Sequence, residues 1–281
     1  MTMIKVGLTT WTDHPFLSSG KKQKITLSEY ARDFSLVEID SSFYRIPPQS
    51  WVTKWQTQVS ADFQFIVKAN YAMTKTPLPH APQLEGAALA KLFTELEQAV
   101  SPLVAANQLQ SLLFQFPPSF TCNVTNVQYL QAIRKRLPQW PIAVEFRHAS
   151  WFANSELTHD TLSFLAGLNY SNVVVDEPHA HNNGVPLVPI VTNPKLAFVR
   201  LHGRNEVAWA EGTRERYRYR YQPAELAQLT TIVQRLEQQA SQVVVIFNNN
   251  AGKDAAPNAL ELKRKLHQEP NGGSLEQLNL F

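Results

Sequence analysis

Charged side chains stand at alternate positions at the ends of short apolar runs in this sequence. Arg200 and His202 alternate with apolar residues in one run, and Glu38 and Asp40 do so in another. Successive side chains of a β-strand point to opposite faces, so we expect each set to lie on one face. The same pattern adds further side chains at the ends of other runs: Lys68, Gln115, Glu145, Arg147 and Asp176.

These residue types are suited to acid–base chemistry. Glu145 paired with His202 or Asp176 could divide proton donation and acceptance, because carboxylates on different strands can be held at different pKa values. We count Glu38 and Lys68 with them as candidate catalytic residues. The alternative is a paired lattice of charges without a ligand, since buried charges normally have partners. The convergence of charges from several strands favours a site.

A metal or a covalent nucleophile has weaker support in the sequence. The carboxylates and histidines of this set could bind one divalent ion, but a His-Glu-x-x-His signature is absent and the nearby Arg and Lys oppose a cation. We therefore predict no metal ligands. There is no Gly-x-Ser-x-Gly elbow, and Cys122 has no persuasive base beside it. Lys68 could form a Schiff base only when uncharged, which carboxylates nearby disfavour.

Eight runs with strand-like composition would position these side chains. They are Ile4–Thr9, Leu36–Asp40, Phe63–Lys68, Leu112–Phe116, Ile142–Phe146, Asn172–Asp176, Leu196–His202 and Val243–Asn248. Helical patterns separate or follow most of them: Leu27–Phe34, Gln49–Val59, Ala87–Asn107, Val127–Leu137, Leu157–Leu168, Ala224–Gln239 and Asn258–His267. This alternation predicts an α/β protein with a single (β/α)8 barrel, whose functional groups gather at the C-terminal ends of the strands. The sixth connection, 177–195, lacks a helical period, so we expect it to be irregular.

Two loops near the last strands have the composition of a phosphate site. One follows the seventh run and contains Arg204, and the other follows the eighth run and begins with Asn248 and Asn249. In such barrels these loops commonly bind an anion through backbone amides and a helix N-terminus. Together with Arg147 and Arg200, the three residues are candidate substrate or phosphate ligands. The alternative for the asparagines is simple turn formation.

Residues 214–221 alternate arginine with tyrosine. As an extended segment they would place Tyr217, Tyr219 and Tyr221 on one side and the arginines on the other. Such a segment can follow a phosphate backbone and stack on bases, which predicts nucleic-acid binding. The alternative is a lid whose tyrosines pack on the barrel while its arginines are solvated. Both interpretations place the segment over the same barrel face.

The composition describes an ordinary globular protein. The chain has 281 residues, 44% of them hydrophobic and 17% charged, and its net charge of +3 is too small to identify a nucleic-acid partner by itself. The single cysteine fits a reducing compartment, and we see neither a signal-peptide pattern nor an apolar run of membrane-spanning length. We expect a cytoplasmic protein without a membrane partner, whose barrel domain comprises residues 1–268.

Residues 269–281 are a separate unit in this interpretation. A Gly-rich stretch precedes the final pentapeptide and should make it flexible. The pentapeptide 277–281 resembles the short motif with which bacterial replication and repair proteins bind the DNA sliding clamp, usually Gln-Leu-(Ser or Asp)-Leu-Phe. Leu278, Leu280 and Phe281 would be apolar anchors, and Gln277 would supply hydrogen bonds. The alternative is that the tail packs on its own barrel.

Several motifs together resemble the YecE-like family, known as domain of unknown function 72. They are Gly7–Trp11, Val37–Tyr44, Phe65–Lys68, Glu145–Trp151, Val199–Arg204 and Phe247–Asn249. The resemblance covers residues 4 to about 267 and implies a TIM-barrel-like fold with a site at its rim, but no particular reaction. Trp11 and Tyr44, which end the first two motifs, join the candidate ligand-binding residues. Asp40 stands where Asn is frequent in the family, and Asn250 stands where an acidic residue is common.

Three functions follow from these patterns. The first is a clamp-tethered barrel that binds phosphate or nucleic acid, including a repair-type hydrolase that uses carboxylate and histidine chemistry. The second is a metabolic enzyme for a small phosphorylated or sugar-like substrate, in which the tail plays no part. The third is a non-catalytic adaptor associated with the clamp. The sequence leaves the reaction, any cofactor and the oligomeric state open.

Overall fold

Eight runs of mainly β-branched and aromatic residues form the strands of the computed structural model, which describes residues 3–18, 24–179 and 183–268. The strands are β1 (Met3–Thr9), β2 (Leu36–Ile39), β3 (Gln64–Lys68), β4 (Leu109–Gln115), β5 (Ile142–Glu145), β6 (Ser171–Asp176), β7 (Ala197–Leu201) and β8 (Gln242–Phe247). Each strand pairs in parallel with the next, and β8 pairs with β1, so the sheet closes into a barrel. The predicted α/β fold with a single eight-stranded barrel is confirmed.

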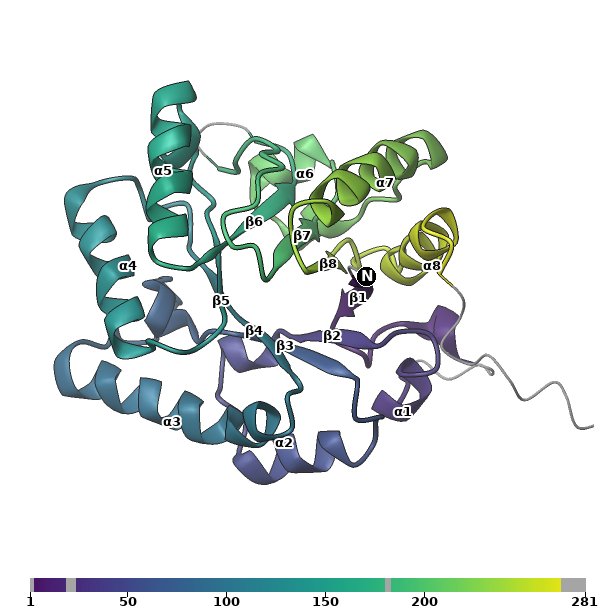
Figure 1. Ribbon diagram of the computed structural model, residues 1–281, viewed down its shortest axis with the longest axis horizontal. Helices are drawn as coiled ribbons and strands as arrows, with labels where there is room; N and C mark the ends of the chain where they lie inside the picture. The colour runs from purple at the N-terminus through teal and green to yellow at the C-terminus, as the bar shows by residue number, and fades with distance from the viewer. Residues whose placement is uncertain (1–2, 19–23, 180–182, 269–281) are drawn as a thin grey trace, which may run out of the picture.

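Helices surround the strands on the outside of the barrel (Figure 1). They are α1 (Leu27–Tyr30), α2 (Gln49–Gln56), α3 (Gly86–Ala105), α4 (Val124–Arg136), α5 (Ser155–Gly167), α6 (Glu206–Glu211), α7 (Pro223–Glu237) and α8 (Ala255–Lys265). The predicted helical stretches correspond to all of these except α6, whose six residues are too few to show a helical period. The described part of 177–196, between β6 and β7, contains no α-helix, as expected for the sixth connection.

Polar residues at the helix starts determine where several helices begin. The side chains of Thr26 and Glu29 form a capping box at α1. Asn123 and Asn154 accept backbone N–H groups at the starts of α4 and α5. These caps satisfy amide groups that the first helical turn leaves without partners.

The buried hydroxyl of Tyr30 joins α1 to two strands. It accepts a hydrogen bond from the backbone N–H of Leu8 at 2.9 Å and donates one to the carbonyl oxygen of Leu36 at 2.7 Å. The backbones approach closely here, because a Cβ atom on Gly7 would lie 2.3 Å from the carbonyl oxygen of Leu36. A buried backbone group without a partner is costly, so Tyr30 stabilises the contact between β1 and the start of β2.

The strand register determines which side chains share the barrel interior. Residues that are paired across parallel strands point to the same side of the sheet. Arg200 of β7 is level with Val175 of β6 and Ile246 of β8, and Gln115 of β4 is level with Glu145 of β5. Apolar side chains therefore occupy the interior beside Arg200, while polar side chains gather from the C-terminal ends of the strands.

The barrel elements run from Met3 to Lys265. Residues 269–281 lie outside the described residues, so their assignment to a separate tail stays a prediction. Among the helices of the described residues, none combines the length and the apolar character that crossing a membrane requires.

Candidate functional site

Arg200 is the centre of an ion-pair network on the barrel axis. Its guanidinium donates to Glu38 through Nε (2.9 Å) and Nη2 (2.6 Å), and to Glu145 through Nη1 (2.6 Å). It also donates to the side-chain oxygen of Gln115 at 3.0 Å. Arg200, Glu38 and Glu145 each have 0% exposure. The predicted convergence of charges from β2, β5 and β7 is therefore observed, beneath the surface of the barrel mouth.

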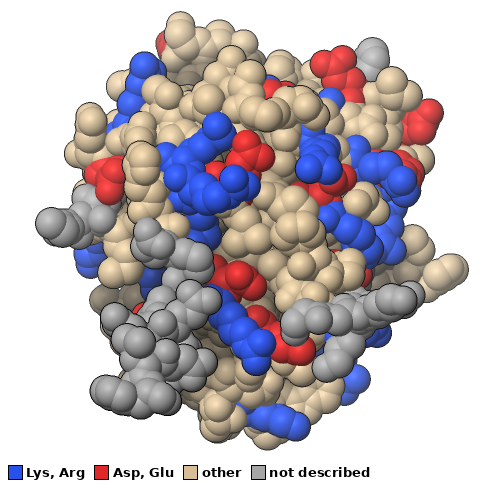
Figure 2. Space-filling view, turned by 90° about the vertical axis from the view of Figure 1, so that its right-hand side faces the viewer, with Lys and Arg blue, Asp and Glu red and all other residues tan. Residues whose placement is uncertain are grey.

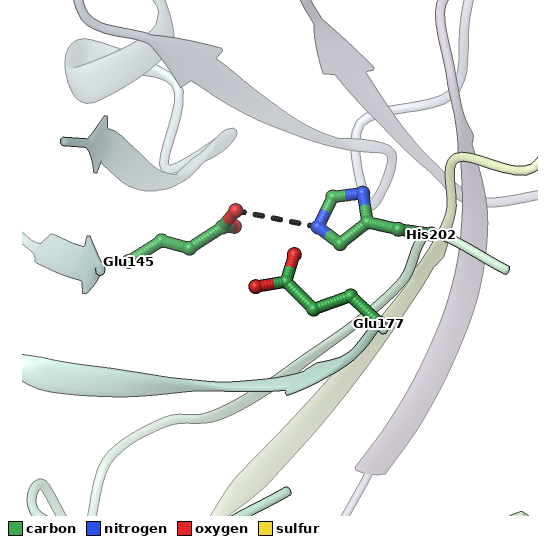
Figure 3. A group of neighbouring side chains, drawn as sticks. All are labelled: Glu145, Glu177 and His202. Atoms are coloured by element: carbon green, nitrogen blue, oxygen red, sulfur yellow. Dashed lines mark ion pairs between the residues drawn. The ribbon is translucent and has the colours of Figure 1, made fainter. Parts of the chain in front are cut away.

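Arg147 extends the network toward β6. Its Nε donates to Glu145 at 2.7 Å, and its Nη1 lies 2.6 Å from an oxygen of Glu177. The Nη2 atom of Arg147 lies 2.9 Å from Nε2 of His202, whose Nδ1 is 2.9 Å from the amide nitrogen of Asn248. Figure 3 shows Glu145 and His202 pointing toward one another, with Glu177 beside them. Three potential proton carriers therefore lie together, held by one guanidinium.

Burial and positive charge set the protonation states of these groups. Burial alone would raise the pKa of Glu145, but Arg200 and Arg147 hold that pKa well below its usual range. Burial raises the pKa of Glu177 to about 8, against the opposing effect of Arg147. Burial and the charge of Arg147 keep the pKa of His202 well below its usual value. At neutral pH we therefore assign a charged Glu145, a protonated Glu177 and a neutral His202.

Glu145, Glu177 and His202 have the residue types of a metal site. Among the described residues, these three form a group in which one potential ligand atom from each lies within 4.8 Å of the others. Both oxygens of Glu145, however, accept from guanidinium groups, and Arg147 also contacts Glu177. Two guanidinium charges at this distance oppose a divalent cation. The prediction that the site has no metal ligands stays a prediction.

A cavity of about 810 Å³ lies above this network at the mouth of the barrel. The strand ends contribute Thr9, Asp40, Lys68, Gln115 and Asn248 to its walls. Nζ of Lys68 lies 2.8 Å from Oδ1 of Asp40, so these two form an ion pair on the wall. Burial would raise the pKa of Asp40, yet Lys68 holds it below its usual value. The accessible acid–base pair of the mouth is therefore Lys68 with Asp40.

The expectation that Asp176 faces the axis is wrong. Asp176 is level with Leu201 in the sheet, so it points to the opposite side from Arg200. Its carboxylate accepts from Arg204 at 2.6 Å and from the hydroxyl of Tyr221 at 2.9 Å. Glu177, one residue later, takes the place on the axis that the prediction gave to Asp176. The run Val173-Val174-Val175 does not alternate in polarity, so the sequence could not show this parity.

The predicted phosphate ligands are separated by the fold. Arg204 is engaged by Asp176 and by Glu225, the latter at 3.0 Å, and does not line the cavity. Asn249 is fully buried, and its amide donates to the carbonyl oxygen of Tyr219 at 2.8 Å. Arg200 is buried in the network. Of these candidates only Asn248 lines the mouth, so they do not form one anion site.

The two predicted ligand-binding residues Trp11 and Tyr44 lie in different places. Trp11 packs edge-on against Trp55, with ring centroids 5.5 Å apart, and lines a surface groove that also contains Trp51. It does not line the cavity of the mouth, so the structure separates it from the other candidates. Tyr44 does line the cavity and is 66% exposed.

The expectation of an extended arginine–tyrosine segment is wrong for its first half, because Arg214–Tyr217 form a short 3-10 helix. Beyond this helix Arg218 and Arg220 are exposed, while Tyr219 and Tyr221 pack inward. Tyr221 is buried against Phe247, and the hydroxyl of Tyr219 donates to Glu225 at 2.7 Å. Of the three tyrosines, only Tyr217 lines the cavity. The segment is therefore closer to the lid alternative than to a stacking surface.

Two further residues of the site were missed at the level of sequence. Trp209 of α6 is fully buried, and its ring lies 6.3 Å from that of His202 and 5.3 Å from the guanidinium carbon of Arg147. Its indole N–H donates to the carbonyl oxygen of Asn183 at 3.0 Å. Glu177 was missed because it lies at the start of the irregular connection. An acidic residue directly after a strand, and an aromatic residue within a polar loop, were the available signals.

The closed barrel with a polar cavity at the C-terminal ends of its strands defines a protein of the (β/α)8 class, in which ligand sites lie at this end. The sequence pattern of the family described as "Protein of unknown function DUF72" matches residues 5–278. The chain belongs to this family, which confirms the resemblance seen in the sequence motifs.

Relatives of similar length support this assignment. The UPF0759 protein YunF of Bacillus subtilis (strain 168) is 37% identical, over 99% of this chain and 100% of its own. The crystal structure of a DUF72 family protein from Enterococcus faecalis V583 has a TM-score of 0.88 and 37% identity, and covers 95% of this chain and 96% of its own. A DUF72 family protein from Thermotoga maritima MSB8 has a TM-score of 0.79 and 30% identity, covering 95% of this chain and 100% of its own.

Replacement of Arg200 by Met should strongly destabilise the protein. The change leaves Glu38 and Glu145 buried without their main partner, which we expect to lower the free energy of unfolding by about 3–5 kcal/mol. Urea unfolding measures this loss. The exposed Arg218→Met is the control and should change stability by no more than about 0.5 kcal/mol. Equal stability of the two variants would contradict a structural role for the network.

Glu177 should make stability depend on pH. Its pKa in the folded protein, about 8, exceeds the ordinary value of 4.5, so the folded state binds this proton more tightly. The contribution to the free energy of unfolding is full below about pH 4.5 and is lost as pH rises through about pH 8. Relative to Glu177→Gln, the wild type should therefore lose stability between pH 5 and pH 8.5 in urea unfolding. The exposed Glu156→Gln is the control, and parallel profiles for wild type and Glu177→Gln would contradict the assignment.

Proposed function

We propose that this protein is an enzyme that binds a small, hydroxyl-rich polar molecule in the barrel mouth. The observation that carries this proposal is the cavity of about 810 Å³, whose walls combine an ion pair with amide and hydroxyl side chains. Its volume lies within the range of small-molecule sites, which is roughly 300–1,000 Å³. This corresponds to the metabolic alternative of the sequence analysis, an enzyme for a small phosphorylated or sugar-like substrate.

Polar atoms of the wall support a ligand with hydroxyl groups. Oγ1 of Thr9 and Oδ1 of Asn250 are buried and have no hydrogen-bond partner among the described residues. Both residues line the cavity. Buried polar atoms are normally paired, so such atoms favour a partner supplied from the cavity. The amide oxygen of Asn250 can only accept, so its partner must be a donor such as a hydroxyl group.

The accessible pair Lys68 and Asp40 is placed to transfer protons in this site. Asp40 is held ionised by Lys68 and can accept a proton, while the ammonium group can stabilise an oxygen that becomes negative. The candidates Glu145, Glu38 and His202 lie beneath the wall at 0% exposure. In this proposal they position the strand ends and Gln115, and Lys68 and Asp40 contact the substrate.

Nucleic acid is less well supported as the occupant. The tyrosines proposed for base stacking are divided between the core, a hydrogen bond to Glu225 and the cavity wall. Figure 2 shows the side of the molecule on which α1 and α8 lie, and there the described Lys and Arg lie beside Asp and Glu and do not form a continuous basic surface. A protein that follows a phosphate backbone requires such a surface.

Replacement of Asp40 by Asn should impair the site without unfolding the barrel. The substrate can be found by screening hydroxylated metabolites for an increase in the unfolding temperature of the wild type. We expect Asp40→Asn to weaken binding or turnover of the compound that is found at least tenfold. Lys54→Met, in the separate tryptophan groove, is the control and should leave both unchanged. Undiminished turnover in Asp40→Asn would contradict the acid–base role.

We also propose that residues 277–281 bind the bacterial sliding clamp. The pentapeptide itself is the observation in favour, and it lies outside the described residues. The eight strands that close the barrel lie within Met3–Phe247, so the described barrel is complete without this segment. Docking would concentrate the protein at DNA without requiring the barrel to bind DNA.

Removal of the two terminal anchors tests the docking proposal. The full chain should bind purified clamp, and the double change Leu280→Ala and Phe281→Ala should weaken the dissociation constant at least tenfold, because buried apolar anchors dominate such contacts. Isothermal titration calorimetry measures both constants. Glu276→Ala, just outside the motif, is the control. Absence of binding by the wild type, or equal binding by the double variant, would refute the proposal.

A further inference from the structure

Arg216 has an unusual environment on the wall of the mouth. It lies in the 3-10 helix Arg214–Tyr217 and lines the cavity. Its guanidinium carbon is 4.9 Å from the ring centroid of Tyr217 and 5.7 Å from that of Trp209. Its Nε atom is buried and has no hydrogen-bond partner among the described residues. The side chain is therefore held by aromatic rings, while its Nε–H has no acceptor among the described residues.

Four of the other arginines near the mouth differ from Arg216 because each of the four has a carboxylate partner. Arg147 pairs with Glu145 and Glu177, Arg200 with Glu38 and Glu145, Arg204 with Asp176, and Arg218 with Glu215. Within the described part of the chain, no such ion pair reaches Arg216. Aromatic contacts restrict a guanidinium without neutralising its charge, and its planar donors match a carboxylate or a phosphate. An anion from the cavity would supply the missing partner.

The charges of the walls also give a ligand a preferred orientation. The two carboxylates on the wall already have lysine partners, Asp40 with Lys68 and Asp13 with Lys253. Arg214 lines the cavity beside Arg216, from the connection between β7 and β8. These two ion pairs leave no net charge next to β1 and β2, so the positive charge that can attract an anionic group lies at Arg214 and Arg216.

We propose that Arg216 binds the anionic group of the ligand, so that the ligand class is a hydroxylated organic anion. The anionic group is a carboxylate or a phosphate, which accepts hydrogen bonds from Nε and from a terminal nitrogen of the guanidinium. The hydroxyl groups then lie toward Thr9, Asn250 and the Lys68–Asp40 pair. This inference rests on the proposed function and adds the charge and the orientation of the ligand.

Arginine side-chain NMR tests the inference directly. The Nε–Hε signal of Arg216 can be assigned by its loss in Arg216→Lys and followed during titration with D-glycerate, glycerol 3-phosphate and glycerol. We expect D-glycerate, glycerol 3-phosphate or both to shift this signal saturably, while neutral glycerol leaves it in place. Comparison of the two anions distinguishes a carboxylate site from a phosphate site. Arg216→Gln should weaken anion binding at least tenfold.

Matched variants separate this inference from the proposed function. Arg218→Gln is the control, because Arg218 is exposed, pairs with Glu215 and does not line the cavity. If neither anion shifts the signal, or if Arg216→Gln and Arg218→Gln bind the anions as tightly as the wild type, the inference is wrong. If Arg216→Gln binds the anions as tightly as the wild type but Asp40→Asn abolishes this binding, the proposed function stands and only the role of Arg216 fails. If Arg216→Gln abolishes binding while Asp40→Asn has no effect, the anion site stands and the hydroxyl site fails.

Discussion

The buried guanidinium of Arg200, with Glu38 on one side and Glu145 on the other, is the contact on which the mouth of this barrel depends. Each ion alone would be strongly disfavoured away from water, so the three must occupy fixed relative positions. Because the residues come from β7, β2 and β5, their pairing joins strands that are not neighbours in the sheet. The network therefore holds the strand ends in place and gives the cavity above it a rigid floor.

The buried network and the cavity wall above it are neighbouring layers of side chains that differ in how their polar groups are paired. Below, every charge has a partner and solvent is excluded. Above, the wall has the Lys68–Asp40 ion pair and, among the described residues, buried oxygens of Thr9 and Asn250 without partners and an arginine in contact with aromatic rings. Unpaired buried polar atoms reduce stability and also occur elsewhere in the described residues, but those of Thr9, Asn250 and Arg216 gather on one cavity. This gathering is the physical reason for placing the ligand there.

Family membership accounts for the fold and leaves the chemistry to the site. The barrel is shared with DUF72 proteins from Enterococcus faecalis and Thermotoga maritima. A barrel of this class supports many reactions, since its loops and strand ends vary independently of the scaffold. Support for a small hydroxylated anion as the ligand therefore comes from Arg216, Thr9, Asn250 and the Lys68–Asp40 pair, and not from resemblance.

The sequence by itself determined the class of fold and the main axis residues. Strands separated by helices predict this barrel, and strict alternation around Glu38 and Arg200 identified both as inward-facing, because the side-chain period of a strand is two. Local patterns could not show whether Asp176 or Glu177 faces the barrel axis, because the preceding valines do not alternate in polarity. Only the pairing with β7 shows to which side of the sheet each residue points. Tertiary structure alone also separated Trp11 and Arg204 from the mouth and brought Arg216 onto its wall. These outcomes depend on distant partners such as Trp55, Asp176 and Trp209, which no local spacing encodes.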